Sequence, residues 1–392
     1  MQGTGVHSIG YRTIFDSHMG RTVEFIIELQ DGACGIGSTS RGETIGIHED
    51  HGLPVDPRVV VDSMRADGEL ADVATQAGFD KLIAKRAGHF GKNTCFALSA
   101  AYFDAWREAG LLKMPEGCKL PRLCMNVLNG GSHAYTNPVL SDFQEFIIVP
   151  KSDDLMKTVA EHGQVQELVK QRLLMCEKSV VNGNPVSIVG PRTAHAPLAF
   201  LAEVLEELGL RKDYDLMIDA SATDLRTSEG YVFAITDGTQ RTTEESVTYW
   251  LEVIEEYSLG FLEDPFHEED LEGWVEITKR CNGRCITIGD NLYVSESARI
   301  ERGAREGHST AVLIKPNQAG SVSATRAAIE AAQAGGLLPI TSHRSISTES
   351  TYVCDATCEY SVPYIKIGPL LSDYSSIMRL NHLLRLAGVG RG

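Results

Sequence analysis

Short apolar runs, each ended by one polar or charged residue and followed by a helical segment, recur along the second half of the chain. The clearest run is 311–314, AVLI, which predicts a strand buried on both faces as in a parallel sheet. Lys315 follows this run directly. The same pattern ends at five further positions, Asp219, Glu263, Asp290, His343 and Lys366. From Glu263 onward the spacing is 23 to 28 residues, about the length of one strand plus one helix.

These six strand ends favour a parallel α/β barrel with a polar site at its mouth. In such a barrel the carboxyl ends of the strands open on one face, so the six side chains are expected to converge there. Each position also has a structural explanation, because an aspartate at a strand end often caps the next helix and a lysine there can reach solvent. That explanation accounts for one or two positions, and not for three acids, two lysines and a histidine in consecutive units.

The first 120 residues have a different pattern. YRTIFDS and TVEFIIELQ are rich in residues that favour strands, and residues 57–110 are helical in pattern, with one helix expected to begin after Gly91. The proline-containing segment CKLPRL near residue 120 is typical of a linker. We therefore expect two domains, residues 1–120 as an α+β domain and residues 121–392 as the barrel.

Local signals predict several boundaries inside the barrel region. MNVLNGG and FQEFIIVP read as two strands joined by a segment too short for a helix, and VSIVG at 186–190 reads as another strand. Ser152, backed by two aspartates, is expected to cap a long helix. Thr242 and Glu245 have the spacing of a capping box.

Composition excludes several classes of function. The 392 residues are 43% hydrophobic and 23% charged, which is typical of a globular protein with room for a large core. A net charge of −17 argues against nucleic-acid or anionic membrane partners. No apolar run approaches the roughly 20 residues of a membrane span, and we expect a cytoplasmic location. The nine cysteines lack zinc-site spacing and are expected to be reduced and mostly buried.

The motifs themselves, in their order, resemble those of enolase. They are FDSHMGRTVEF, MNVLNGGSHAYTNP, DFQEFIIVP, LMIDASATDL, GFLEDPFHEEDLEGW, ITIGDNLYVS, AVLIKPNQAGS, ITSHRS and YIKIG. The resemblance covers nearly the whole chain. It implies a smaller N-terminal α+β capping domain and a modified eight-stranded (β/α) barrel whose first strands are antiparallel. It also implies a homodimer or higher homo-oligomer.

The resemblance assigns the central residues of a site. It implies that Asp219, Glu263 and Asp290 bind Mg²⁺, and three carboxylates also suit that hard ion by their own chemistry. Lys315 then corresponds to the base that removes the proton next to the substrate carboxylate, and Lys366 to the residue that holds this carboxylate. Two neighbouring cationic groups and the metal would stabilise the enolate.

Further positions match groups around the substrate. Arg344 and Ser345 match a phosphate-binding pair. His343 and His133 match histidines near the substrate, although a lone histidine is more often structural. Two more matches are Glu145, which retains one of the two family glutamates, and Thr44, which stands where enolase has a serine that coordinates a second magnesium ion.

Two arginines mark a departure from the family pattern. Arg192 stands where enolase has the glutamate that acts as general acid, and an arginine is a poor proton donor. The loss of a positioned acid usually costs roughly a hundred- to ten-thousandfold in rate. Arg41 adds a second positive charge near the loop that carries Thr44. A structural explanation of Arg192 is a substitution in a surface loop.

These departures suggest a pocket reshaped for a second anion, such as a phosphonate or carboxylate, beside 2-phosphoglycerate or phosphoenolpyruvate. The resemblance then extends to the specialised relative carboxyphosphonoenolpyruvate synthase, an enzyme of phosphonate antibiotic biosynthesis. Two alternatives stay open. One is an ordinary phosphopyruvate hydratase, and the other is a non-catalytic protein with an enolase fold that serves for binding.

Overall fold

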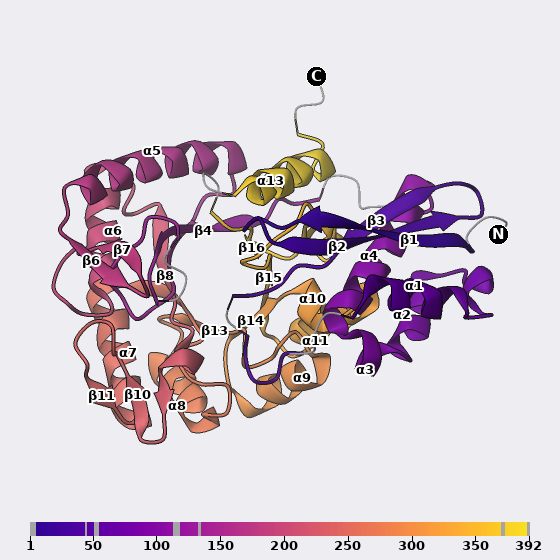
Figure 1. The fold of residues 1–392 in the computed structure, drawn as a ribbon. Coiled ribbons are helices and arrows are strands. Elements are labelled where there is room, and N and C mark those ends of the chain that lie inside the picture. The colour runs from indigo at the N-terminus through magenta and orange to yellow at the C-terminus, as the bar shows by residue number, and fades with distance from the viewer. Residues whose placement is uncertain are drawn as a thin grey trace.

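The computed structural model describes residues 5–43, 45–50, 55–112, 118–131, 135–369 and 373–389. An N-terminal part, indigo to purple in Figure 1, lies beside a closed barrel that takes up the rest of the chain. This arrangement confirms the expected α/β fold class with a smaller N-terminal part. The division of the chain at residue 120 stays a prediction.

The N-terminal part is an antiparallel sheet with helices packed on it. Its strands follow the order β1 (Val6–Phe15), β2 (Arg21–Leu29) and β3 (Cys34–Ser38). Its helices are α1 (Pro57–Arg65), α2 (Gln76–Ala84), α3 (Ala87–Phe90) and α4 (Lys92–Glu108), with a 3₁₀ turn at Leu70–Asp72. Helix α4 begins after Gly91, as predicted.

Strand β3 and helix α4 approach each other unusually closely. A Cβ atom on Gly35 would lie 2.0 Å from the backbone nitrogen of Ala105, and one on Gly37 would lie 2.0 Å from the carbonyl oxygen of Ala97. No side chain fits at these distances, so β3 can lie on α4 only because both positions are glycine.

Eight strands close the barrel in the order β12, β13, β14, β15, β16, β4, β5 and β8. In chain order they are β4 (Arg122–Asn129), β5 (Glu145–Pro150), β8 (Tyr214–Asp219), β12 (Leu259–Glu263), β13 (Ile286–Gly289), β14 (Ala311–Ile314), β15 (Leu338–Ser342) and β16 (Tyr364–Lys366). Strand β5 is antiparallel to both β4 and β8, and the other neighbouring pairs are parallel. The modified barrel with an antiparallel beginning is therefore confirmed.

Helices and two small sheets surround the barrel. The helices are α5 (Leu155–Leu174), α6 (Ala196–Glu207), α7 (Thr243–Tyr257), α8 (Leu271–Cys281), α9 (Ser297–Glu306), α10 (Pro316–Ala319), α11 (Val322–Ala334), α12 (Tyr352–Glu359) and α13 (Tyr374–Leu386). The small sheets are β6 (Lys178–Val181) with β7 (Asn184–Ser187), and β9 (Arg226–Thr227) with β10 (Gly230–Val232) and β11 (Gln240–Arg241), next to a 3₁₀ turn at Ala222–Leu225. No helix in the described ranges is long and apolar enough to cross a membrane.

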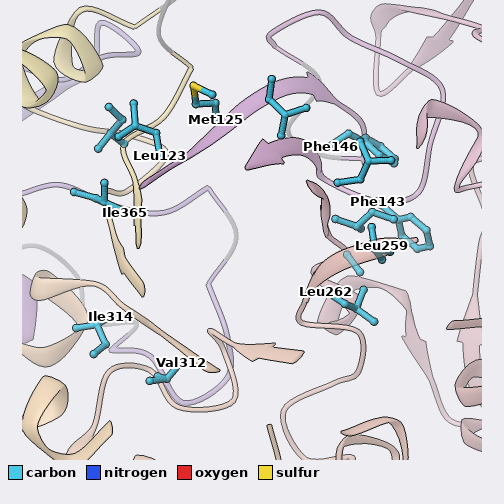
Figure 2. Close-up of a cluster of buried hydrophobic side chains, with 14 of the residues drawn as sticks. Leu123, Met125, Phe143, Phe146, Leu259, Leu262, Val312, Ile314 and Ile365 are labelled. Atoms are coloured by element: carbon cyan, nitrogen blue, oxygen red, sulfur yellow. The ribbon is translucent and has the colours of Figure 1, made fainter. Parts of the chain in front are cut away.

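The barrel strands bury both faces, each in a different core. Val312 and Ile314 belong to the large cluster that the strands share with the surrounding helices, part of which is shown in Figure 2. The alternate residues Ala311 and Leu313 belong to a separate cluster that contains only strand residues among its fully buried members. This two-sided burial explains the continuous apolar run that precedes Lys315.

Two of the local predictions for the barrel region were wrong in detail. Helix α5 begins at Leu155, because Asp154 accepts the capping hydrogen bond from Lys157 N, whereas Ser152 Oγ accepts one from Asp154 N. The strand predicted at 186–190 ends at residue 187 and pairs in the β6–β7 hairpin outside the barrel, since positive φ angles at 182 and 183 turn the chain back. The capping box of Thr242 is confirmed.

Buried hydrogen bonds join the two parts of the chain at the start of α11. Asp80 Oδ2 accepts from Ser323 N at 2.8 Å, and Ser99 Oγ accepts from Val322 N at 2.8 Å. The N-terminal helices therefore supply acceptors to the first turn of α11, which orients the N-terminal part relative to the barrel. All nine cysteines are free thiols and seven of them are buried, in agreement with the prediction.

Candidate active site

The six polar residues predicted at strand ends lie at one mouth of the barrel. Strands β8, β12 and β16 end on Asp219, Glu263 and Lys366. The other three, Asp290, Lys315 and His343, directly follow β13, β14 and β15. Because these six strands are parallel to their neighbours from β8 to β16, their carboxyl ends share one face. The structure thus brings the six residues together, while their chemical roles stay predictions.

Lys366 lies among three carboxylates. Its Nζ is 2.8 Å from Glu145 Oε2, 2.8 Å from Glu263 Oε2 and 3.1 Å from Asp219 Oδ2. Burial alone would lower the pKa of Lys366, but the charges of these carboxylates raise it well above its ordinary value. Lys366 is therefore a buried ammonium group, suited to hold a negative charge and unsuited to accept a proton.

Lys315 lies on the rim with its ammonium group paired to Asp290. Its backbone nitrogen donates to Ser295 Oγ at 2.8 Å, and Gln318 accepts from the same hydroxyl at 2.9 Å. Gln318 Nε2 also approaches Asp290 Oδ1 at 3.4 Å. The side chain of Lys315 is partly accessible and lines a cavity, so its amine can meet a bound molecule.

Carboxylates outnumber cations around these lysines. Five of them gather there against two lysines, namely Glu145, Asp219, Glu263, Asp264 and Asp290. Burial, and then the charges of Asp219 and Asp290, raise the pKa of Glu263 well above its usual range, although Lys366 opposes the shift. Glu263 is fully buried, and its Oε1 accepts no hydrogen bond from any described residue.

The carboxylates of Asp219, Glu263 and Asp290 are suitable ligands for a hard divalent cation, although their oxygens are not arranged around one common point here. The ammonium group of Lys366 lies between Asp219 and Glu263, and Lys315 is paired with Asp290. Within the described ranges, no group of three or more His, Cys, Asp or Glu side chains is arranged to hold a metal. Carboxylate oxygens are nevertheless what Mg²⁺ prefers, and the surplus of negative charge and the orphaned Glu263 oxygen suit a cation.

His343 is a neutral imidazole with a defined tautomer. Burial first, and then the positive charges of Arg379 and Lys366, lower the pKa of His343 well below its ordinary value. Its Nδ1 lies 3.1 Å from the carbonyl oxygen of Lys366, which can only accept, so Nδ1 carries the proton. Nε2 is then an acceptor.

Arg344 and Ser345, the expected phosphate-binding pair, both contact the segment that follows β3. Arg344 Nη1 lies 2.6 Å from Glu49 Oε1, and Nη2 lies 3.2 Å from Glu49 Oε2. Ser345 Oγ accepts from the backbone nitrogen of Glu43 at 2.9 Å. The N-terminal part therefore completes the surroundings of the site.

Two adjoining cavities open at this mouth. The first, of about 40 Å³, is lined by both lysines, Arg344 and Asp219, among others. The second, of about 230 Å³, extends toward the N-terminal part. They share Glu145, His343 and Ser345. The second cavity is lined by polar groups, including His18, Glu43, Asn126 and Asn129.

Two of the predicted residues, both arginines, are not brought into this group. Arg41 is 63% exposed at its side chain, lies 3.8 Å from Asp16, and lines neither cavity. Arg192 is exposed in the segment between β7 and α6 and lines neither cavity. Thr44 and His133 lie outside the described residues.

Three residues of the site escaped the sequence analysis. Asp264 is buried and accepts from the backbone nitrogens of Asp290 and Asn291, each at 2.9 Å, which fixes the Asp290 backbone. Gln318 donates a hydrogen bond to Glu49, and Glu49 pairs with Arg344. The paired acids Glu263 and Asp264 after one apolar run were a usable signal for Asp264, whereas neither of the other two directly ends a strand.

A comparison with known families agrees with this geometry. Residues 117–389 match the family described as enolase, C-terminal TIM barrel domain. The match covers well over half of the chain and includes all eight barrel strands together with the six residues at the mouth. The chain therefore belongs to the enolase superfamily of enzymes.

Proposed function

We propose that this enzyme uses Mg²⁺ to act on 2-phosphoglycerate or phosphoenolpyruvate together with a second anionic substrate, as carboxyphosphonoenolpyruvate synthase does. With 2-phosphoglycerate the reaction begins with removal of the proton next to the carboxylate. The observation that carries the proposal is the convergence of Lys315, Lys366 and three acids at one mouth beside Arg344. Removal of a carbon-bound proton needs a base and positive charge beside the developing enolate; Lys315 can supply the base, and Lys366 together with bound Mg²⁺ would supply the charge.

The side chains have distinct roles in this proposal. Lys315, after its Nζ has lost a proton to give the neutral amine, accepts the substrate proton there, and Lys366 donates hydrogen bonds to the substrate carboxylate. Asp219, Glu263 and Asp290 would hold Mg²⁺, which when bound supplies further positive charge for the developing enolate. Arg344 and Ser345 donate to the phosphate, and neutral His343 accepts a hydrogen bond at Nε2.

Room for a second substrate supports the specialised activity. The cavity of about 230 Å³ touches the first one along Glu145, His343 and Ser345. A small molecule bound there would lie beside the enolate, and it would face His18 and His343 as well as the acids Glu43, Glu145 and Asp373. This support replaces the charge argument from Arg41 and Arg192, because neither arginine lines the cavity.

An ordinary phosphopyruvate hydratase is the second candidate, and the same two arginines favour it. Because Arg41 and Arg192 line neither cavity, neither is placed to bind a second anion there. A coupled assay that follows phosphoenolpyruvate formed from 2-phosphoglycerate separates the candidates. The specialised enzyme should turn over slowly and should bind phosphonoformate in the presence of Mg²⁺ and phosphoenolpyruvate, measured by calorimetry.

The assay has a matched pair of lysine variants. Lys315→Ala should abolish turnover, whereas Lys119→Ala should not, because Lys119 is 77% exposed and pairs with Asp153 in a surface contact. Turnover at ordinary enolase rates would rule out the specialised activity. Retained turnover in Lys315→Ala would remove the proposed base.

A further inference from the structure

The segment after β3 crosses the mouth of the barrel, and we call its described residues, 39–43 and 45–50, the mouth loop. In Figure 1 it is the indigo coil that leaves β3 and runs beside the barrel strands. Arg41 exchanges two backbone hydrogen bonds with Ile346, each 3.0 Å long, just after β15. The loop is thus attached to the barrel next to the expected phosphate-binding residues.

Glu49 is the acid of this loop that reaches Arg344. Its two oxygens accept from Nη1 and Nη2 of the guanidinium at 2.6 Å and 3.2 Å, and the two side chains are 11% and 3% exposed. A two-point contact of this kind fixes the plane of the guanidinium as well as its position. It uses two of the five N–H donors, and a third approaches Asn317 Oδ1 at 3.5 Å, so two stay available to another anion.

A second contact connects Glu49 with Asp290 and Lys315, which follow the neighbouring strands β13 and β14. Gln318 Nε2 donates to Glu49 Oε2 at 3.1 Å and approaches Asp290 Oδ1 at 3.4 Å. Gln318 Oε1 accepts from Ser295 Oγ, which in turn accepts from the backbone of Lys315. One hydrogen-bonded chain therefore runs from Arg344 through Glu49 to the neighbourhood of the proposed base.

The carboxylate of Glu49 has two opposite possible effects on a phosphate ligand. It can compete for Arg344, or it can hold Arg344 in the orientation that a phosphate needs. The cavity decides between them, because Arg344 lines it and Glu49 does not. Glu49 is therefore not part of the cavity wall, and this favours the second effect.

We infer that Glu49 is a positioning residue that orients Arg344 toward a phosphate or phosphonate group and links it through Gln318 to Asp290. This inference rests on the proposed function for the identity of the substrate. It adds the requirement that a residue of the N-terminal part, 295 positions away in the chain, sets the affinity for the phosphate group.

The test compares Glu49→Gln with Glu269→Gln. Glu269 also contacts the mouth loop, through His48, but its side chain is 57% exposed and lies away from Arg344. Loss of a charge-assisted contact that orients a donor should weaken binding of inorganic phosphate about tenfold in Glu49→Gln, measured by calorimetry. In Glu269→Gln the affinity should stay within about twofold, since exposed pairs contribute little.

Steady-state kinetics and proteolysis provide two further readouts. With 2-phosphoglycerate, Glu49→Gln should raise KM about tenfold and change kcat little, a split that general loosening of the fold would not produce. Trypsin cleavage after the exposed Arg41 should be severalfold faster in Glu49→Gln than in wild type, because the loop has lost its buried anchor.

Two results would overturn the inference. Tighter phosphate binding by Glu49→Gln would show that Glu49 competes with phosphate for Arg344. Unchanged binding would show that the Glu49–Arg344 pair does not affect the affinity for phosphate. The phosphate and trypsin measurements do not depend on turnover. A wild type that fails to turn over 2-phosphoglycerate but loses phosphate affinity in Glu49→Gln would therefore refute the proposed function and support the role of Glu49.

Discussion

Replacing Glu263 by glutamine should abolish the stabilisation that Mg²⁺ gives to the folded chain while leaving the metal-free protein about as stable as before. Glu263 is fully buried among other acids, and its raised pKa shows that its surroundings disfavour the charge. A neutral side chain of the same shape removes that unfavourable charge. Lys366 keeps Glu145 and Asp219 as partners in the variant.

The size of the effect follows from linkage. A ligand that binds only the folded state adds about 2.7 kcal/mol when its concentration is a hundred times Kd. Unfolding entropy is roughly 2.1 cal/mol/K per residue, so a chain of 392 residues gains or loses about 0.8 kcal/mol per degree near Tm. Saturating Mg²⁺ should therefore raise the Tm of the wild type by about 3 °C.

The assay is thermal unfolding followed by circular dichroism, with and without Mg²⁺. Glu244→Gln serves as the matched control, because its side chain is 70% exposed and its partner is Arg280 on a neighbouring helix. The control should show the full shift of Tm, and Glu263→Gln should show none. A wild-type Tm that ignores Mg²⁺, or an undiminished shift in Glu263→Gln, would refute the assignment of Glu263 as a ligand.

Two further predictions concern the core. Burial lowers the pKa of His162 from 6.5 to about 4, so the unfolded chain takes up this proton first as pH falls. The free energy of unfolding should therefore decrease by at most about 3 kcal/mol as the pH falls from 6.5 to 4. Urea titrations of His162→Leu should show a smaller decrease over the same range. A variant with the same pH dependence as the wild type would contradict this role of His162. Trp274, fully buried, should cost about 3–5 kcal/mol on replacement by alanine, measured by urea denaturation, and a loss under 1 kcal/mol would contradict tight packing there.

Much of the barrel could be predicted because each strand is a short apolar run that can be recognised from a few neighbouring residues. The run 311–314 and its lysine identify a strand end from five consecutive residues, and the capping box of Thr242 needs only four. The boundary at Ser152 was misplaced because three polar residues in a row can each cap a helix, and only the final chain direction selects Asp154.

The contacts made by the site could not be read from the sequence in the same way. Glu49 and Arg344 are separated by 295 positions, so only the folded arrangement of the two parts brings them together. The charge of a residue near a motif also does not show where its side chain points. Arg41 was therefore expected at the substrate, whereas its side chain lies near Asp16.

The close approach of β3 to α4 affects where the mouth loop can lie over the barrel. Because β3 continues directly into the mouth loop, Gly35 and Gly37 determine the position at which that loop meets the barrel. A larger residue at either position would lift the strand from the helix and carry Glu49 with it. The width of the opening can thus be altered by residues that never touch a ligand.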